Sequence, residues 1–145
     1  MRSSGGFESR SRARRRALQA IYQWRMTGKE PVEIISEFRE EQDFSNVDLG
    51  LFEALVRGVA EQSEDLGKGL EPFVDRPLSN LDIMERVILD IGFFELGHSP
   101  GTPAKVILDE CIELAKRFGA EQGHNFINGV LDKAARTLRK DEFAA

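Results

Sequence analysis

Apolar residues recur at intervals of three and four along most of the chain, the spacing that places side chains on one face of an α-helix. Glycine and proline interrupt this pattern at points where helices commonly end or begin, as at Gly28 and Pro31. No segment alternates between apolar and polar residues as a strand would. The predicted helices cover residues 11–27, 31–42, 45–59, 63–70, 80–98, 103–118 and 121–139.

Polar residues before three of these helices predict where they begin. Ser45 is expected to cap the third helix, Ser79 or Asn80 the central one, and Thr102 a helix whose first residue is Pro103. The central helix is apolar nearly all round, which is typical of a helix surrounded by others. The pattern therefore predicts an all-α fold, a single compact domain of about seven helices.

The length of 145 residues suits one domain, and the composition bears on its location. The most apolar stretch, residues 87–96, contains Asp90 and Glu95, so we expect no membrane span. No apolar signal core follows the N-terminus. The single cysteine, Cys111, cannot form an internal disulfide and fits a core position in a cytoplasmic protein.

The net charge of −5 is unevenly distributed. Residues 1–16 contain six arginines and one glutamate, a charge of +5. The remainder contains 14 basic and 24 acidic residues, a charge of −10. A basic segment on an acidic body can direct an anionic partner to one place, and the acidic body could bind a second, basic partner.

Five of these arginines fall within seven residues, where we expect the first helix to begin: Arg10, Arg12, Arg14, Arg15 and Arg16. Cations are unfavourable at a helix N-terminus unless an anion is near, and free N–H groups there bind phosphate. The segment is therefore either a site for a phosphate backbone or a solvated, disordered tail. Composition alone leaves both interpretations open.

Enzyme chemistry finds little support in the residues. Two histidines and one cysteine do not form a metal-ligand motif, and there is no phosphate-binding glycine loop. Asp109, Glu110 and Glu113 have helical spacing, which is typical of a solvated face. We expect a binding protein with no catalytic residue, metal or cofactor.

Three segments carry a resemblance that covers nearly the whole chain, from Ser11 to Leu138. They read RRRALQAIYQW near the N-terminus, ERVILDIGFFEL in the middle, and PAKVILDECIELAKRFGAEQGHNFINGVLDKAA near the C-terminus. With these segments the chain resembles the NusB family of bacterial transcription antitermination factors. The related domain of some RNA cytosine methyltransferases is fused to a catalytic domain that 145 residues cannot hold.

The resemblance implies an all-helical fold with two packed helical halves. It implies binding of boxA, a short single-stranded element of leader and ribosomal RNA transcripts, together with NusE, which is also a small-subunit ribosomal protein. It further implies work with other Nus factors and RNA polymerase in reading through terminators. Some members form homodimers that hide the RNA surface. The domain would span residues 11–139, after a flexible basic leader (1–10) and before a polar tail (140–145).

The resemblance also implies RNA-binding residues in two segments. They are Arg10, Arg12, Arg14, Arg15, Tyr22, Gln122 and Phe126. Arginine can pair with phosphates and stack on unpaired bases, and Phe126 could stack on a base. Tyr22 could equally be an aromatic at the edge of the core, and Phe126 on spacing alone would be a core residue.

The turn before the central helix and that helix's first residues match a region that, in the family, contributes to NusE binding and to the junction with RNA. They include Phe73, Arg76, Asp82, Glu85 and Arg86. Glu85 is favoured at a helix start by the helix dipole alone, so a structural role is as good an explanation for it. The competing functional hypothesis is a helical protein-interaction module that has no RNA role of its own.

Overall fold

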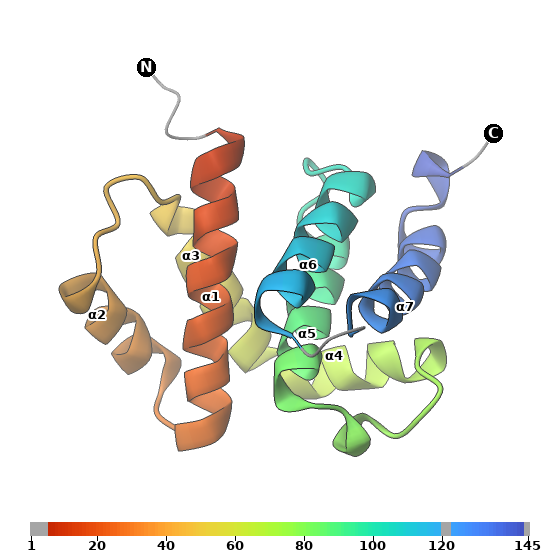
Figure 1. Cartoon of the computed structure of the whole chain (residues 1–145), viewed down its shortest axis with the longest axis horizontal. Coiled ribbons are helices and arrows are strands. Elements are labelled where there is room, and N and C mark those ends of the chain that lie inside the picture. The colour runs from red at the N-terminus through yellow and green to blue at the C-terminus, as the bar shows by residue number, and fades with distance from the viewer. Residues whose placement is uncertain (1–5, 120–122, 144–145) are drawn as a thin grey trace. The chain divides into compact units, whose positions relative to one another are not determined.

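A computed structural model describes residues 6–119 and 123–143, and the regular structure of this part of the chain is entirely helical (Figure 1). The α-helices are α1 (Phe7–Thr27), α2 (Pro31–Glu41), α3 (Leu49–Glu61), α4 (Ser63–Leu70), α5 (Ile83–His98), α6 (Ala104–Phe118) and α7 (Gly123–Leu138). Short 3₁₀ helices are η2 (Glu71–Phe73), η3 (Leu78–Asn80) and η4 (Lys140–Glu142). The all-α prediction is confirmed. None of the described helices is long and apolar enough to cross a membrane.

The helices form two compact units, Met1–Gln62 and Ser63–Ala145, here called the N-terminal and C-terminal units. In the N-terminal unit, α1 packs on α3 and α2 contacts both. The buried face of α1 carries Ala13, Ala17, Leu18 and Ile21, as the spacing predicted. Glycine at the end of α1 is also explained, because Gly28 adopts the left-handed conformation that ends many helices (φ 75°).

In the C-terminal unit, α5 contacts α4, α6 and α7. Its residues from Val87 to Gly92 are all buried, which confirms its central position. The three long helices approach closely at Gly92, where an added Cβ would lie 2.7 Å from Leu131 Cδ1 and 2.9 Å from Cys111 Sγ. Only a residue without a side chain fits there, and Cys111 belongs to the core as expected.

Helix α1 begins at Phe7, before the predicted start near Ser11. The N–H of Arg10 already donates to the carbonyl of Gly6 at 3.2 Å. Residues 7–10 of the predicted leader are therefore helical, and Arg12 to Arg16 lie in the second and third turns. These arginines do not surround the free N–H groups of the helix end, so the helix-dipole argument for an anion site does not apply to them.

All three predicted caps are also wrong, and in two cases an aspartate closer to the helix is the cap. The carboxylate of Asp48, not Ser45, accepts from Leu51 N–H at 3.0 Å and caps α3. Asp82 caps α5 by accepting from the N–H groups of Met84 and Glu85 at 3.1 and 3.3 Å. In both cases the aspartate nearest the apolar run is the cap, because the helix begins only where its side chains can reach the core.

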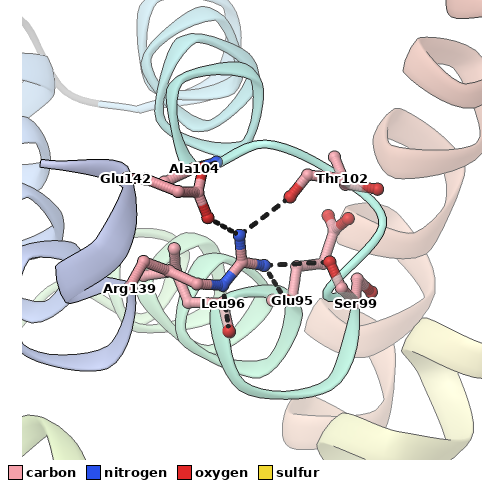
Figure 2. A network of polar contacts seen from close by, with 7 residues as sticks. All are labelled: Glu95, Leu96, Ser99, Thr102, Ala104, Arg139 and Glu142. Carbon is pink, nitrogen blue, oxygen red and sulfur yellow. Dashed lines mark hydrogen bonds and ion pairs between the residues drawn. The ribbon is translucent and has the colours of Figure 1, made fainter.

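The predicted polar tail is folded as far as the structure describes it. Residues Lys140–Glu142 form η4, and Glu142 Oε1 accepts from Ala104 N–H at 2.8 Å. This bond occupies a free donor at the start of α6, for which Thr102 had been the predicted cap. Arg139 lies at the centre of the same network, surrounded by the carbonyl groups that end α5 and precede α6 (Figure 2).

Candidate nucleic-acid interface

The arginine-rich segment of α1 is divided between the surface and the core. Arg10, Arg12, Arg15 and Arg16 are half-buried, whereas Arg14 is 1% exposed. Successive helical residues turn by about 100°, which places Arg14 between Leu18 and Ile21 on the buried face of α1. A side chain that is 1% exposed presents almost no surface to a ligand, so Arg14 is not included in the candidate surface, and its predicted RNA contact stays a prediction.

Arg12 and Arg16 are used by the protein itself. Arg16 Nη1 donates to the carbonyl of Asp43 at 2.8 Å, and its guanidinium lies 5.0 Å from the centre of the Phe44 ring. Arg12 Nη1 donates to the carbonyl of Asn46 at 3.4 Å. We call these contacts the loop staple, because they hold the segment between α2 and α3 against α1. Both arginines remain partly exposed at their outer edges.

Two charged groups at the loop staple, Asp43 and Arg12, also interact with residues close to them in the sequence. The pKa of Asp43 is lowered because its carboxylate accepts a hydrogen bond from the Ser45 N–H at 2.9 Å, and to a smaller extent because Arg16 is near. Arg12 Nη2 also pairs with Glu8 Oε2 at 3.7 Å, one helical turn away. Such exposed pairs can exchange an intramolecular partner for a phosphate at small cost.

Arg12, Arg15 and Tyr22 share one side of α1, since Tyr22 lies about two turns after Arg15. Tyr22 is half-buried, which is compatible with a base contact and with a core-edge aromatic. Its predicted RNA contact therefore stays a prediction.

In the C-terminal unit, Phe126 lies in the first turn of α7 and is half-buried. The guanidinium of Arg76 lies over its ring, with Cζ 4.3 Å from the ring centre. Arg76 Nε also donates to Asp75 Oδ1 at 2.9 Å, and this contact is the main cause of the lowered pKa of Asp75. The structure thus joins two residues that sequence reasoning had assigned to different partners. Gln122 lies outside the described residues.

The other predicted partner-binding residues have structural contacts. Arg86 Nε pairs with Asp90 Oδ1 at 2.9 Å and Nη2 reaches the carbonyl of Ser63 at 3.3 Å, while Asp82 caps α5. Glu85 Oε2 would lie 2.9 Å from a Cβ added at Gly123, the first residue of α7. Its carboxylate therefore faces the positive end of that helix, where a negative charge is favoured.

Phe73 ends η2, and its ring centre lies 6.4 Å from that of Phe93 in α5. Phe93 in turn packs so tightly on α4 that a Cβ at Gly69 would lie 2.5 Å from its ring. Phe73 is half-buried and anchors the segment that leads to Arg76. Its predicted contact with a protein partner stays a prediction.

Sequence reasoning missed two residues of these sites, Asp75 and Arg139. Asp75 had a weak signal, since an acidic residue beside a basic one in a turn can fix the direction of the basic side chain. Arg139 had none. Apart from Glu142, its acceptors are the main-chain carbonyl groups of Glu95, Leu96, Ser99 and Thr102, about 40 residues earlier in the chain.

Comparison with known proteins agrees with this fold. The chain matches the NusB family over residues 11–136. The transcription antitermination protein NusB of Stenotrophomonas maltophilia is 46% identical over 133 residues, covering 92% of this chain and 84% of that protein. The protein of the same name from Nitrosococcus oceani is 48% identical over 134 residues, covering 92% and 90%.

Solved structures show the same fold. NusB from T. maritima superposes with a TM-score of 0.81 at 26% identity, covering 92% of this chain and 95% of that one. A structure of the antitermination factors NusB and NusE in complex with double-stranded RNA matches with a TM-score of 0.82 at 25% identity, covering 91% and 99%. The helical architecture, the extent of the match and the identity to the relatives agree: this chain belongs to the NusB family of transcription antitermination proteins.

Proposed function

We propose that this protein binds single-stranded boxA RNA of ribosomal RNA transcripts together with NusE and thereby helps RNA polymerase, with other Nus factors, to read through terminators. Its mechanism is binding, not catalysis. Arginines neutralise phosphates and fix the RNA in place, while unpaired bases that stack or form hydrogen bonds supply sequence preference.

One observation carries the RNA role of this chain in particular. The first 16 residues have a charge of +5 on a protein whose remainder has a charge of −10, and four of the five clustered arginines reach the surface of α1. An acidic body repels RNA, so a concentrated basic surface would decide where RNA binds. Arg14 is not part of this surface.

A protein partner is supported by the relative whose structure contains NusB, NusE and RNA in one complex. We propose that NusE, a ribosomal protein, binds the C-terminal unit near Phe73 and the first turn of α5. The acidic body suits a basic partner of this kind. Asp82 and Arg86 would act there mainly by holding α5 in shape.

The experiment is a salt titration of RNA binding. For a single strand each neutralised phosphate contributes about −0.7 to the slope of log affinity against log salt, so three or four contacts predict a slope of about −2 to −3. Replacing Arg10, Arg12 and Arg15 together by alanine should make the slope less steep, reducing its magnitude by about 2, and should weaken binding to every RNA. The matched control replaces three arginines elsewhere: Arg39, Arg57 and Arg136.

The titration is run on single-stranded and double-stranded boxA, with and without NusE. Binding of the single strand with a steep slope supports the proposal. A slope near zero, or equal losses in the two triple variants, contradicts the role of the α1 arginines. Absence of RNA binding even with NusE present would favour the competing function, a helical protein-interaction module without an RNA role.

A further inference from the structure

Arg76 and Phe126 form a single layered contact on the surface of the C-terminal unit. The guanidinium lies over the ring, 4.3 Å from Cζ to the ring centre, which is contact distance. The ring face of Phe126 is therefore already occupied in the unbound protein. A base cannot stack directly on that face unless Arg76 first leaves it.

Arg76 is held in this position from two sides. Asp75 Oδ1 accepts from its Nε at 2.9 Å, and one face of its guanidinium packs on the ring of Phe126. The chain before Arg76 is also fixed, because η2 contacts α7 and Phe73 lies against Phe93. The guanidinium is thus positioned before any ligand arrives, which reduces the conformational entropy lost on binding.

The outer side of Arg76 is accessible. Its side chain is 45% exposed. Among the described residues, only Asp75 Oδ1 accepts a hydrogen bond from it, and it does so from Nε, so no described residue accepts from the two terminal Nη groups. A guanidinium plane stacks on unpaired bases as aromatic rings do, and its N–H groups can pair with phosphate at the same time.

We propose that Arg76, not Phe126, is the residue on which an unpaired RNA base stacks, and that Phe126 is the platform that holds the Arg76 guanidinium for this contact. This assignment rests on the RNA-binding function proposed above and deepens it. Stacking on the outer face keeps both existing contacts of Arg76. Displacement by a base would break the contact with Phe126.

The two arrangements predict opposite signs for one substitution. If a base stacks on Arg76, Arg76→Ala removes its surface and weakens single-stranded boxA binding roughly 10-fold, within the range that one stacked base contributes. If instead a base must displace Arg76 to reach Phe126, Arg76→Ala uncovers the ring and binding becomes tighter. Affinities are measured with full-length protein and NusE at one fixed salt concentration.

A second variant separates stacking from charge. Arg76→Lys keeps the positive charge but lacks the planar face, so we expect it to weaken binding about 5-fold while leaving the salt slope unchanged. Replacing each RNA base in turn by an abasic nucleotide then identifies the stacked position. Wild type should bind the RNA that is abasic at this position about 10-fold more weakly than it binds intact RNA. The Arg76→Ala variant should bind the abasic and the intact RNA equally well.

Phe126→Leu tests the platform, since leucine preserves an apolar side chain but offers no ring face. We expect a loss about half as large on a logarithmic scale as that of Arg76→Ala, at the same abasic position. Asp75→Asn should tighten binding about 2-fold, because it removes a negative charge that repels phosphate while its oxygen can still accept from Arg76.

Arg136 provides a matched control on the same helix. Its guanidinium lies 4.8 Å from the ring centre of Phe143 and its Nε pairs with Asp132 at 3.0 Å, so it repeats the arrangement at a distant point of α7. Arg136→Ala removes the same charge and should change affinity less than 2-fold.

The outcomes separate the two proposals. Suppose that wild type binds RNA and that Arg76→Ala leaves the affinity unchanged, raises it, or lowers it no more than Arg136→Ala does. Any of these results overturns this inference and leaves the proposed function standing. A lysine variant that binds like wild type overturns it as well, because charge alone then suffices. If wild type binds no RNA with NusE present, the proposed function fails and this inference fails with it.

Discussion

The loop staple of the N-terminal unit and the Arg139 network of the C-terminal unit are built from the same side chain and differ in burial. Arg12 and Arg16 each reach one loop carbonyl from the surface of α1. Arg139 has a side chain 9% exposed and donates to the carbonyls of Leu96, Ser99 and Thr102 (Figure 2). The same cation is therefore exchangeable in one unit and structural in the other.

The difference follows from what replaces water. A buried guanidinium needs a partner for most of its five N–H groups, and the free carbonyls at the end of α5 supply them. A half-exposed guanidinium keeps water on its outer edge and loses little when it changes partner. The sequence thus shows where arginines are concentrated, whereas burial decides which of them are accessible to an anionic ligand.

Arg139→Ala should have the largest effect on stability. It removes the side-chain donor to four partly buried carbonyl groups and the partner of Glu142, and we expect the C-terminal unit to lose about 3 kcal/mol of unfolding free energy. Urea denaturation followed by circular dichroism measures the loss. Arg136→Ala, on the same helix but exposed, is the control and should change stability by less than about 0.5 kcal/mol. A loss below about 1 kcal/mol for Arg139→Ala would contradict the structural role.

Asp48→Ala should have an intermediate effect. Asp48 ends the segment held by the loop staple and caps α3, so its removal should cost about 1 kcal/mol. The same denaturation experiment with Ser45→Ala provides the comparison, and we expect almost no change there because the Ser45 side chain does not cap the helix. Equal losses of unfolding free energy in the two variants would contradict the assignment of Asp48 as the cap of α3.

Arg16→Ala should be milder still. One exposed hydrogen bond and one contact with the Phe44 ring are lost, which predicts a cost of about 0.5 kcal/mol. A loss approaching that of Arg139→Ala would show that the loop staple is as structural as the buried network and would weaken the case for exchange with phosphate.

The smallest effect concerns pH. The pKa of Glu142 is lowered from its ordinary 4.5, first because its carboxylate accepts from Ala104 N–H and then because of Arg139. A lowered folded-state pKa gives a contribution to stability that is complete above about pH 4.5 and is lost as the pH falls through the lower value. Unfolding midpoints between pH 6 and 3 should therefore fall more for wild type than for Glu142→Gln. The same dependence of the unfolding midpoint on pH in both proteins would contradict a stabilising role for the Glu142 carboxylate.

Parts of this fold could be predicted because they depend on neighbours in the sequence. The apolar spacing of α1, the left-handed Gly28 that ends it and the nearly all-apolar α5 were all readable from local pattern. The uneven charge was readable too, since it needs only counting. The family resemblance rested on long continuous segments and was confirmed by the match over residues 11–136.

Other features were decided by contacts between distant residues. Arg14 was counted with the surface arginines, but its direction on α1 buries it. Thr102 was expected to cap α6, yet the capping oxygen comes from Glu142, 38 residues after Ala104. Helix starts at Asp48 and Asp82 depended on where each helix meets its core, which no local signal specifies.

The sequence by itself determined the helices, the family and the concentration of positive charge, because each is a property of continuous segments. Only the tertiary structure decided which arginines face solvent and which residue covers Phe126. Arg76 and Phe126 are 50 positions apart, and a guanidinium meets a ring only when the folded chain brings them to contact distance. The physical reason is that helical periodicity acts over a few residues, whereas burial and pairing of charge depend on packing.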